Sequence, residues 1–268
     1  LEPGNRGGEM VYDPDNKRYL FFGGYDGTTR YNTVWAKYVD EPGQPWRIVT
    51  TTGTPPSGRN LFAMTLVRGN LTSGGALRSY IIIWGGADPN DKNDMLALRI
   101  DTPGSEAWTT ITQTSAPSAR SYVGNHMVAT PVSGASDQNY IYLFGGWAAS
   151  RENALFRCTF DVDAPTAVTW TTLLANGAGG NPTARSGALL DYKASTSKLY
   201  LYGGYSGSAM LTDFWEYDIA GNTWTNTSPS GTAPTGSEAL AGGYDAANNR
   251  FWFTGGWTTN GTFTTSIN

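Results

Sequence analysis

The side chains that usually carry catalysis or bind transition metals are scarce in this sequence. Its 268 residues include one histidine, His126, and one cysteine, Cys158. Most zinc or copper sites need more of these groups than the chain has. His126 is predicted to lie in a strand, and Cys158 to be a buried small residue of the alternating segment 156–160. We therefore predict no catalytic residue, no metal ion and no cofactor.

Four arginines recur at the same distance after a proline. The spacing is Pro-x-x-Arg, and the arginines are Arg6, Arg59, Arg120 and Arg185. A fifth copy of the spacing, which begins at Pro234, carries Ser237 instead. Two interpretations are open: the guanidinium groups bind a partner, or each one caps backbone carbonyls of a neighbouring repeat through its planar set of donors. Strict repetition favours the second, because a ligand rarely shares the symmetry of a repeat protein.

A second repeated position is aromatic in four of its five copies. It directly follows a double glycine and holds Tyr25, Ala87, Trp147, Tyr205 and Trp257. Tyrosine and tryptophan offer flat apolar area with a polar group, which suits protein and sugar partners alike. Packing against a neighbouring repeat is the alternative. The polar residues close to this position vary between copies, as binding residues on loops do, and those we select are Asp26, Arg30, Tyr31 and Arg151.

The elements that must position these residues are short strands. An apolar, aromatic run ends at a double glycine five times, and its copies are 19–24, 80–86, 140–146, 199–204 and 251–256. Such runs, closed by glycine, are typical of buried strands, and the second glycine is expected to have φ > 0. The double glycine recurs at steps of 62, 60, 58 and 52 residues, which indicates a repeat architecture.

Each repeat is predicted to form four strands, a to d, and the fold class is all-β. Strand a follows the arginine position and strand b is the run before the double glycine. Strand c contains a large apolar residue, at Trp35, Leu96, Phe156, Trp215 and Ile267. Strand d contains a lone tryptophan, at Trp46, Trp108, Trp170 and Trp224. The chain is expected to be a single domain, with repeats at approximately 1–52, 53–114, 115–178, 179–231 and 232–268.

Composition excludes two classes of partner. The net charge is −4, only 15% of residues are charged, and no basic stripe is present, so we expect no nucleic acid. No apolar stretch approaches the roughly 18 residues of a membrane span. A surface of Thr, Ser, Asn and Gly suits a secreted protein, extracellular or at the cell surface, with a cytoplasmic location as the alternative.

The repeated positions resemble the kelch repeat over essentially the whole chain. This resemblance implies a β-propeller in which each repeat forms one four-stranded antiparallel blade around a central channel. It also implies that the d–a and b–c loops share one face, so the arginines and the aromatic position would surround one mouth of the channel. The related galactose oxidase binds copper through two histidines and a tyrosine–cysteine pair, which this chain cannot supply.

The fifth repeat departs from the family pattern. Its strand c residue is Ile267 and the given sequence stops at Asn268, so its outer strand and tryptophan are missing. We expect this blade to have three strands, or to be completed by a further chain segment or by homo-assembly.

The function predicted from the sequence is binding. The chain is expected to be a non-catalytic scaffold that engages a protein partner through the d–a and b–c loops. Two alternatives are a carbohydrate-binding surface module and a sugar-acid isomerase or lyase of the kelch type. A glycan site would show Trp147 and Trp257 exposed along a shallow groove. An enzyme would show a carboxylate in a deep pocket with a pKa shifted by burial.

Overall fold

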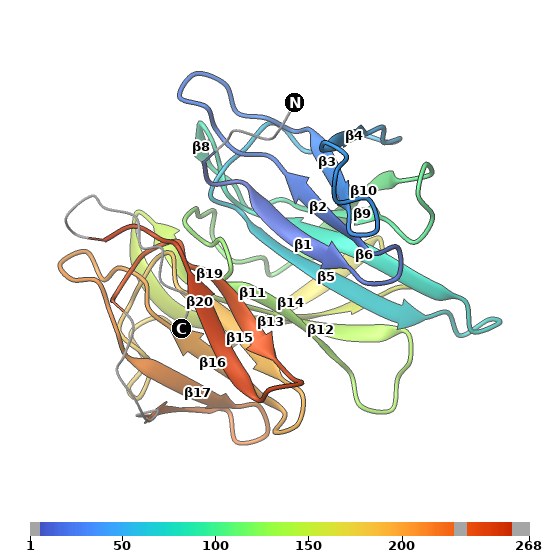
Figure 1. Cartoon of the computed structure of the whole chain (residues 1–268). Helices are drawn as coiled ribbons and strands as arrows, with labels where there is room; N and C mark the ends of the chain where they lie inside the picture. The colour runs from blue at the N-terminus through green and yellow to red at the C-terminus, as the bar shows by residue number, and fades with distance from the viewer. Residues whose placement is uncertain (1–5, 228–234, 259–268) are drawn as a thin grey trace. The chain divides into compact units, whose positions relative to one another are not determined.

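The structure is a computed structural model that describes residues 6–227 and 235–258 (Figure 1). All regular secondary structure in these two ranges is β-strand, twenty strands in total, which confirms the predicted all-β class. The described part contains no helix with the length and hydropathy that a membrane span requires.

The first repeat forms the sheet β1-β2-β3-β4, in which consecutive strands are antiparallel. Its strands are β1 (Glu9–Asp13), β2 (Arg18–Phe22), β3 (Val34–Tyr38) and β4 (Arg47–Val49). The second repeat contributes β5 (Ala63–Asn70), β6 (Leu77–Trp84), β9 (Met95–Arg99) and β10 (Ala107–Thr114), with the small hairpin β7 (Ala87–Asp88) and β8 (Asn90–Asp91). Both sheets follow the predicted order a, b, c, d.

The third and fourth repeats have the same strand order. They consist of β11 (Met127–Pro131), β12 (Gln138–Ala148), β13 (Ser150–Asp161) and β14 (Ala167–Leu174), then β15 (Leu189–Lys193), β16 (Lys198–Tyr202), β17 (Phe214–Asp218) and β18 (Thr223–Thr227). In the fifth repeat the structure describes the a–b hairpin, β19 (Ala241–Asp245) and β20 (Arg250–Thr254). Its predicted strand c, at Ile267, lies outside the described residues.

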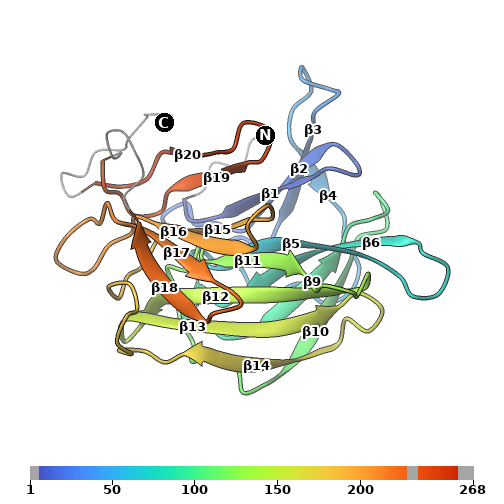
Figure 2. The ribbon, with the colours of Figure 1, turned by 90° about the horizontal axis from the view of Figure 1, so that it is seen from below.

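The outer strands of the second and third repeats join their sheets into one of eight strands (Figure 2). The end of β10 pairs in parallel with the start of β14, with Thr112 opposite Ala167. A single parallel bridge between Thr52 and Ala107 connects the first two repeats in the same way. The end of one outer strand therefore meets the start of the next.

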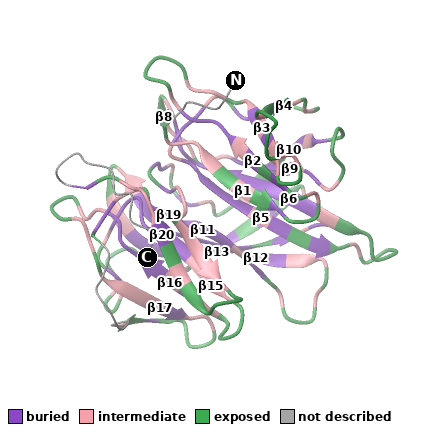
Figure 3. Ribbon diagram, in the orientation of Figure 1, coloured by how far each residue is buried: buried purple, intermediate pink, exposed green. Residues whose placement is uncertain are grey.

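The chain divides into two compact units, which we describe separately. The first contains residues 1–121, 129–141 and 158–170, and the second contains residues 122–128, 142–157 and 171–268. In the first unit, the facing sides of the first two sheets form one apolar core that includes Leu20, Phe22, Ile83 and Leu96. In the second unit, Leu189, Tyr202, Leu240 and Phe253 form a core between the fourth and fifth repeats. Figure 3 shows burial concentrated in the strands and exposure in the loops.

The tryptophans of β10, β14 and β18 each pack edge-on against the aromatic residue that directly precedes the double glycine of the preceding repeat. The ring centroids are 5.5 Å apart for Trp108 and Phe22, and 6.2 Å apart for Trp170 and Trp84. In the second unit, Trp224 lies 5.6 Å from Phe144. The predicted tryptophan position is confirmed in β10, β14 and β18, whereas Trp46 directly precedes β4 and is only partly buried.

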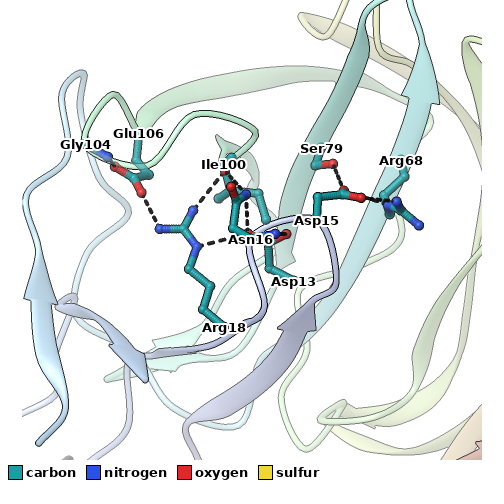
Figure 4. A network of polar contacts seen from close by, with 9 residues as sticks. All are labelled: Asp13, Asp15, Asn16, Arg18, Arg68, Ser79, Ile100, Gly104 and Glu106. Atoms are coloured by element: carbon teal, nitrogen blue, oxygen red, sulfur yellow. Dashed lines mark hydrogen bonds and ion pairs between the residues drawn. The ribbon is translucent and has the colours of Figure 1, made fainter. Parts of the chain in front are cut away.

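A buried ionic cluster connects the first two repeats (Figure 4). The Arg18 guanidinium donates to Asp13 Oδ2 at 2.9 Å, to Glu106 Oε1 at 2.7 Å and to the carbonyl of Ile100 at 2.9 Å. Asn16 also donates to Asp13 Oδ2, at 2.9 Å. Arg18, Asp13 and Glu106 are each at most 1% exposed, so one guanidinium is held between two carboxyl groups inside the protein.

His126 corrects one prediction, because it lies just before β11 and not in the strand. It is fully buried in the second unit, with Nδ1 2.7 Å from the carbonyl oxygen of Phe144. Its Nε2 accepts a hydrogen bond from the backbone N–H of Ala188. Cys158 is buried in β13 as expected, and burial raises the pKa of its thiol. Both side chains are structural.

Candidate functional site

Arg59 and Arg185, two of the predicted binding arginines, are buried with internal partners. Arg59 forms two hydrogen bonds with the Asp94 carboxylate, at 2.6 and 2.7 Å, and donates to the Gly85 carbonyl at 3.0 Å. Arg185 repeats this arrangement with Asp213, at 2.6 and 2.7 Å, and with the Gly203 carbonyl at 2.9 Å. Burial favours a higher pKa for Asp213, but the bonds and charge of Arg185 hold it below its usual range.

Arg120 is also buried, 1% exposed, and donates to the carbonyl and the hydroxyl of Ser118. Buried guanidinium groups with internal partners are not available to a macromolecule on the surface. The structure therefore favours the interpretation that these arginines cap backbone carbonyls. One detail is corrected: Arg59 and Arg185 each donate to the carbonyl of the first glycine of the double glycine in their own repeat, not in a neighbouring one.

Arg6 does not belong to the arginine column. Its backbone pairs with Tyr25, as Asn60 pairs with Ala87 and Ser186 with Tyr205. Arg6 is therefore equivalent to the residue after Arg59, and the Pro-x-x-Arg spacing placed it one position out of register. Unlike the buried arginines, it is exposed, and its guanidinium lies 5.4 Å from the centroid of the Tyr25 ring.

The aromatic position after the double glycine lies at the surface in both units. Tyr25, Trp147 and Tyr205 are partly exposed, and Trp257 is 51% exposed. The second glycine of every pair has φ between 89° and 96°, which confirms the predicted left-handed backbone. This conformation turns the chain so that the next residue pairs with the start of strand a, as the backbone bonds of Trp257 to Glu238 show at 2.8 and 2.9 Å.

In the first unit, an arginine of the b–c loop covers this aromatic position. The Arg30 guanidinium lies 4.7 Å from the Tyr25 ring centroid, and its Nε donates to Asn60 Oδ1 at 3.1 Å. Beside it, the Asp26 carboxylate accepts hydrogen bonds from the Tyr31 hydroxyl at 2.5 Å and from the Thr29 and Thr28 backbone. These bonds hold the pKa of Asp26 far below its usual range. Asp26, Arg30 and Tyr31 thus shape one loop.

In the second unit, Arg151 has the same role and makes more contacts. Its guanidinium lies 4.4 Å from the Tyr205 ring centroid and 5.0 Å from that of Trp147. Arg151 Nε donates to the Ser186 hydroxyl at 3.0 Å, and this hydroxyl donates to Glu238 Oε1 at 2.6 Å. We call these five residues the Arg151 cluster.

The carboxyl group of Glu238 is partly shielded from water within the Arg151 cluster. Its burial raises the pKa, while the hydrogen bond from Ser186 and the charge of Arg151 act in the opposite direction. Ser186 cannot use a histidine as a base, because the imidazole of His126 bonds to the backbone of Phe144 and Ala188.

Two more carboxyl groups have raised pKa values, which the enzyme alternative required. Burial raises the pKa of Glu9 in β1 to about 8, although the residue as a whole is only partly buried. Burial also raises the pKa of Asp191 in β15, against the effect of its bonds from the Tyr192 and Tyr244 amides.

Sequence reasoning found the aromatic and arginine members of these clusters but missed Ser186, Glu238 and Asn60. These three residues could have been found from the sequence, because each directly follows an arginine position. Backbone pairing places that residue beside the residue that follows the double glycine. The structure brings together Arg6, Tyr25, Asp26, Arg30 and Tyr31 in the first unit, and Trp147, Arg151 and Tyr205 in the second. That all of them share one face stays a prediction.

Comparison with protein families agrees with this architecture. The family model of the KLHDC2/KLHL20/DRC7 Kelch-repeats domain matches residues 73–267, most of the chain. The chain belongs to the kelch-repeat family, and its four-stranded sheets are the blades of a kelch-type β-propeller.

Proposed function

We propose that this protein binds a protein partner through its b–c loops, with the Arg151 cluster as a principal contact. The observation that carries the proposal is the set of contacts that the Arg151 guanidinium makes. Its guanidinium is fixed by two aromatic rings and by Ser186, while its two terminal nitrogens donate no hydrogen bond within the described residues. They are available to an acceptor on a partner.

The physical chemistry of this arrangement suits a binding hot spot. Arginine, tryptophan and tyrosine are the residues most enriched among such anchors. A side chain already held in place loses little conformational entropy on binding, so more of the contact energy appears as affinity. Arginine also presents its donors in a planar fork that fits a carboxylate or a backbone carbonyl. The surface therefore favours a partner segment that offers acceptors beside an apolar residue.

The test compares partner capture by the wild-type chain and by Arg151→Ala. Proteins retained from an extract of the source organism are quantified by mass spectrometry, and the affinity of each is then measured with purified components. We expect the loss of Arg151 to cost about 2 kcal/mol or more of binding free energy, as for a hot-spot residue. The melting temperature should change little.

Arg47→Ala is the matched control. Like Arg151, Arg47 lies over a tyrosine, 5.6 Å from the Tyr38 ring centroid, but it is exposed and belongs to β4 and not to a b–c loop. Its loss should leave binding unchanged. Equal binding by wild type, Arg151→Ala and Trp147→Ala, with all three folded, contradicts the proposal.

A glycan is the second candidate partner. The supporting observation is that the exposed ring of Trp257 belongs to the residue paired with Glu238, whose carboxylate is bonded to the Ser186 hydroxyl. Aromatic faces beside carboxylate and hydroxyl groups suit sugar rings and their hydroxyls. Binding to a glycan array that is lost in Trp257→Ala, without capture of any protein, would favour this candidate over the first.

A further inference from the structure

A row of three paired residues lies at the b–c loop of the first repeat. Tyr25 is bridged on one side to Arg6 and on the other side to Arg30, both times in antiparallel register. Residues that are directly opposed in antiparallel pairing project to the same side of the sheet. Arg6 and Arg30 therefore flank the Tyr25 ring on one surface, with their guanidinium carbons 5.4 Å and 4.7 Å from its centroid.

The two arginines of this row are specific to the first repeat. In the fourth repeat, the same backbone bridges connect Tyr205 with Ser186 and with Met210. In the second repeat, Ala87 is bridged to Asn60. These repeats form the loop without arginine at those positions, so the fold does not require the charges. Residues that differ between matched loops are where specific contacts are made.

The charges of Arg6 and Arg30 are not neutralised by any carboxylate in the part of the chain that the structure describes. Arg6 is exposed and Arg30 partly exposed. The acid of the same loop, Asp26, is engaged by the Tyr31 hydroxyl and by backbone amides of its own turn. Other arginines at the surface do have partners: Arg47 pairs with Glu41, Arg68 with Asp15, and Arg250 with Asp245. Two like charges beside one ring repel each other, and a bound anion would relieve this repulsion.

Asn60 adds a further donor to the row. Its Oδ1 accepts the hydrogen bond from Arg30 Nε at 3.1 Å. A guanidinium can only donate, so this bond fixes which end of the amide faces Arg30. The other end, Nδ2, donates no hydrogen bond within the described residues, although Asn60 is only 7% exposed. A polar group in this position is open to an acceptor that a ligand supplies.

We propose that Arg6, Arg30 and Asn60 bind a phosphate dianion, either on a phosphorylated side chain or as free phosphate. The groups that converge here are donors, which favours an oxyanion over a cation. Two guanidinium charges match the charge of a dianion better than that of a single carboxylate. The site belongs to the first unit, whereas the Arg151 cluster belongs to the second, and the inference does not depend on the proposed function.

The test measures ligand binding to the whole chain by isothermal titration calorimetry at low salt and pH 7.5. The probes are inorganic phosphate and a blocked tripeptide with phosphoserine between two alanines. The controls are acetate and the same tripeptide with aspartate or serine at the centre. We expect one of the phosphate probes to bind at least tenfold more tightly than every control.

The two probes also identify the carrier of the phosphate. Tighter binding of the tripeptide points to a phosphorylated side chain, and tighter binding of inorganic phosphate points to the free ion. Equal affinity for phosphoserine and aspartate tripeptides, with inorganic phosphate no tighter than acetate, overturns the proposal. So does the absence of binding by both phosphate probes.

Variants test whether the named residues make the site. Arg6→Gln and Arg30→Gln should each weaken phosphate binding about tenfold or more, because each removes a charge-assisted contact. Asn60→Asp keeps the acceptor for Arg30 Nε but replaces the free amide donor with a second oxygen, so it should remove binding while the melting temperature changes little. Arg47→Ala is the control and should bind as wild type. Unchanged affinity in the double variant Arg6→Gln with Arg30→Gln overturns the proposal.

The charge of the ligand gives an independent readout through pH. The second pKa of a phosphate monoester is about 6, so the dianion predominates only above that pH. The arginines stay charged, and Asp26 stays ionised because its pKa is held far below the usual range. Affinity should therefore rise several-fold from pH 5 to pH 7.5, and this rise should shrink in Arg6→Gln. An affinity that is the same at both pH values overturns the proposal.

Discussion

At the residue scale, the double glycines show how one backbone conformation is repeated to build every blade. Gly86 has φ near 90°, and a Cβ atom there would lie 2.6 Å from Phe62 Cβ and 2.8 Å from the Asn60 carbonyl oxygen. Both steric contact and backbone strain therefore exclude a side chain. The same φ occurs at Gly146, so Gly146→Val should be destabilising for the backbone reason alone.

We predict that Gly86→Ala lowers the free energy of unfolding by about 3 kcal/mol or more. The matched control is Gly43→Ala, because a Cβ at Gly43 meets no atom within 4 Å and its φ is not positive. That change should leave stability within about 0.5 kcal/mol of wild type. Chemical denaturation followed by tryptophan fluorescence measures both. Similar stability of the two variants would contradict the role assigned to the second glycine.

Arg18 and Arg250 occupy equivalent positions in two turns of the same sequence pattern, but their surroundings differ. Both turns have the spacing Asp-x-x-Asn-x-Arg, at residues 13–18 and 245–250. Arg18 is 1% exposed and reaches Glu106 and Ile100 of the next blade. The Arg250 side chain is 68% exposed and pairs with Asp245 at 3.4 Å. The sequence alone does not distinguish them, since burial depends on the neighbouring blade.

We predict that Arg18→Ala costs about 3–5 kcal/mol, because it leaves the buried carboxylates of Asp13 and Glu106 without a cation. Arg250→Ala should change stability by no more than about 0.5 kcal/mol. Thermal and urea denaturation of the two variants would decide the matter. If both arginines prove dispensable, the ionic cluster does not hold the first two blades together.

At the element scale, the outer strands owe their stability to the tryptophan that packs on the preceding blade. Trp108 is 6% exposed and contacts Phe22 edge-on at 5.5 Å, whereas Trp46 is partly exposed at the edge of its blade. We predict that Trp108→Ala costs about 3–5 kcal/mol, as for a large aromatic residue removed from a core. Trp46→Ala is the control and should cost clearly less. Equal losses would show that the tryptophan stabilises its own sheet and not the contact between sheets.

Strand identity and order could be predicted because each repeat carries the same local pattern. The apolar runs, the strand c residues and the outer tryptophans lie in the expected strands wherever the structure describes them, apart from Trp46. The place of Arg6 could not be predicted, since the Pro-x-x-Arg spacing is the same in every copy while the backbone pairing is one residue out of step. Ser186 and Glu238 were missed for a related reason: they meet Arg151 only through strand pairing between repeats.

At the scale of the whole molecule, partly buried carboxyl groups make the free energy of unfolding depend on pH in two opposite directions. The pKa of Asp213 is held low by Arg185, so its contribution is present at neutral pH and is lost as the pH falls. The pKa of Glu9 is raised by burial from 4.5 to about 8, so the folded state prefers the neutral acid. Lowering the pH therefore removes the stabilisation that ionised Asp213 provides, whereas raising it destabilises the fold through Glu9.

For Glu9 the sign follows from proton uptake. Below pH 4.5 the group is protonated in both the folded and the unfolded chain and has no effect on stability relative to glutamine. Between pH 4.5 and about 8 the folded chain holds a proton that the unfolded chain has released, so stability falls as the pH rises.

Glu9→Gln removes this cost, because the amide is neutral at every pH. We predict that Glu9→Gln gains about 1–3 kcal/mol over wild type between pH 4.5 and pH 8. Urea denaturation at several pH values measures the gain, with Glu41→Gln, whose side chain is 42% exposed, as control. A Glu9→Gln difference that does not grow with pH would show that this carboxyl is already hydrated in the folded protein.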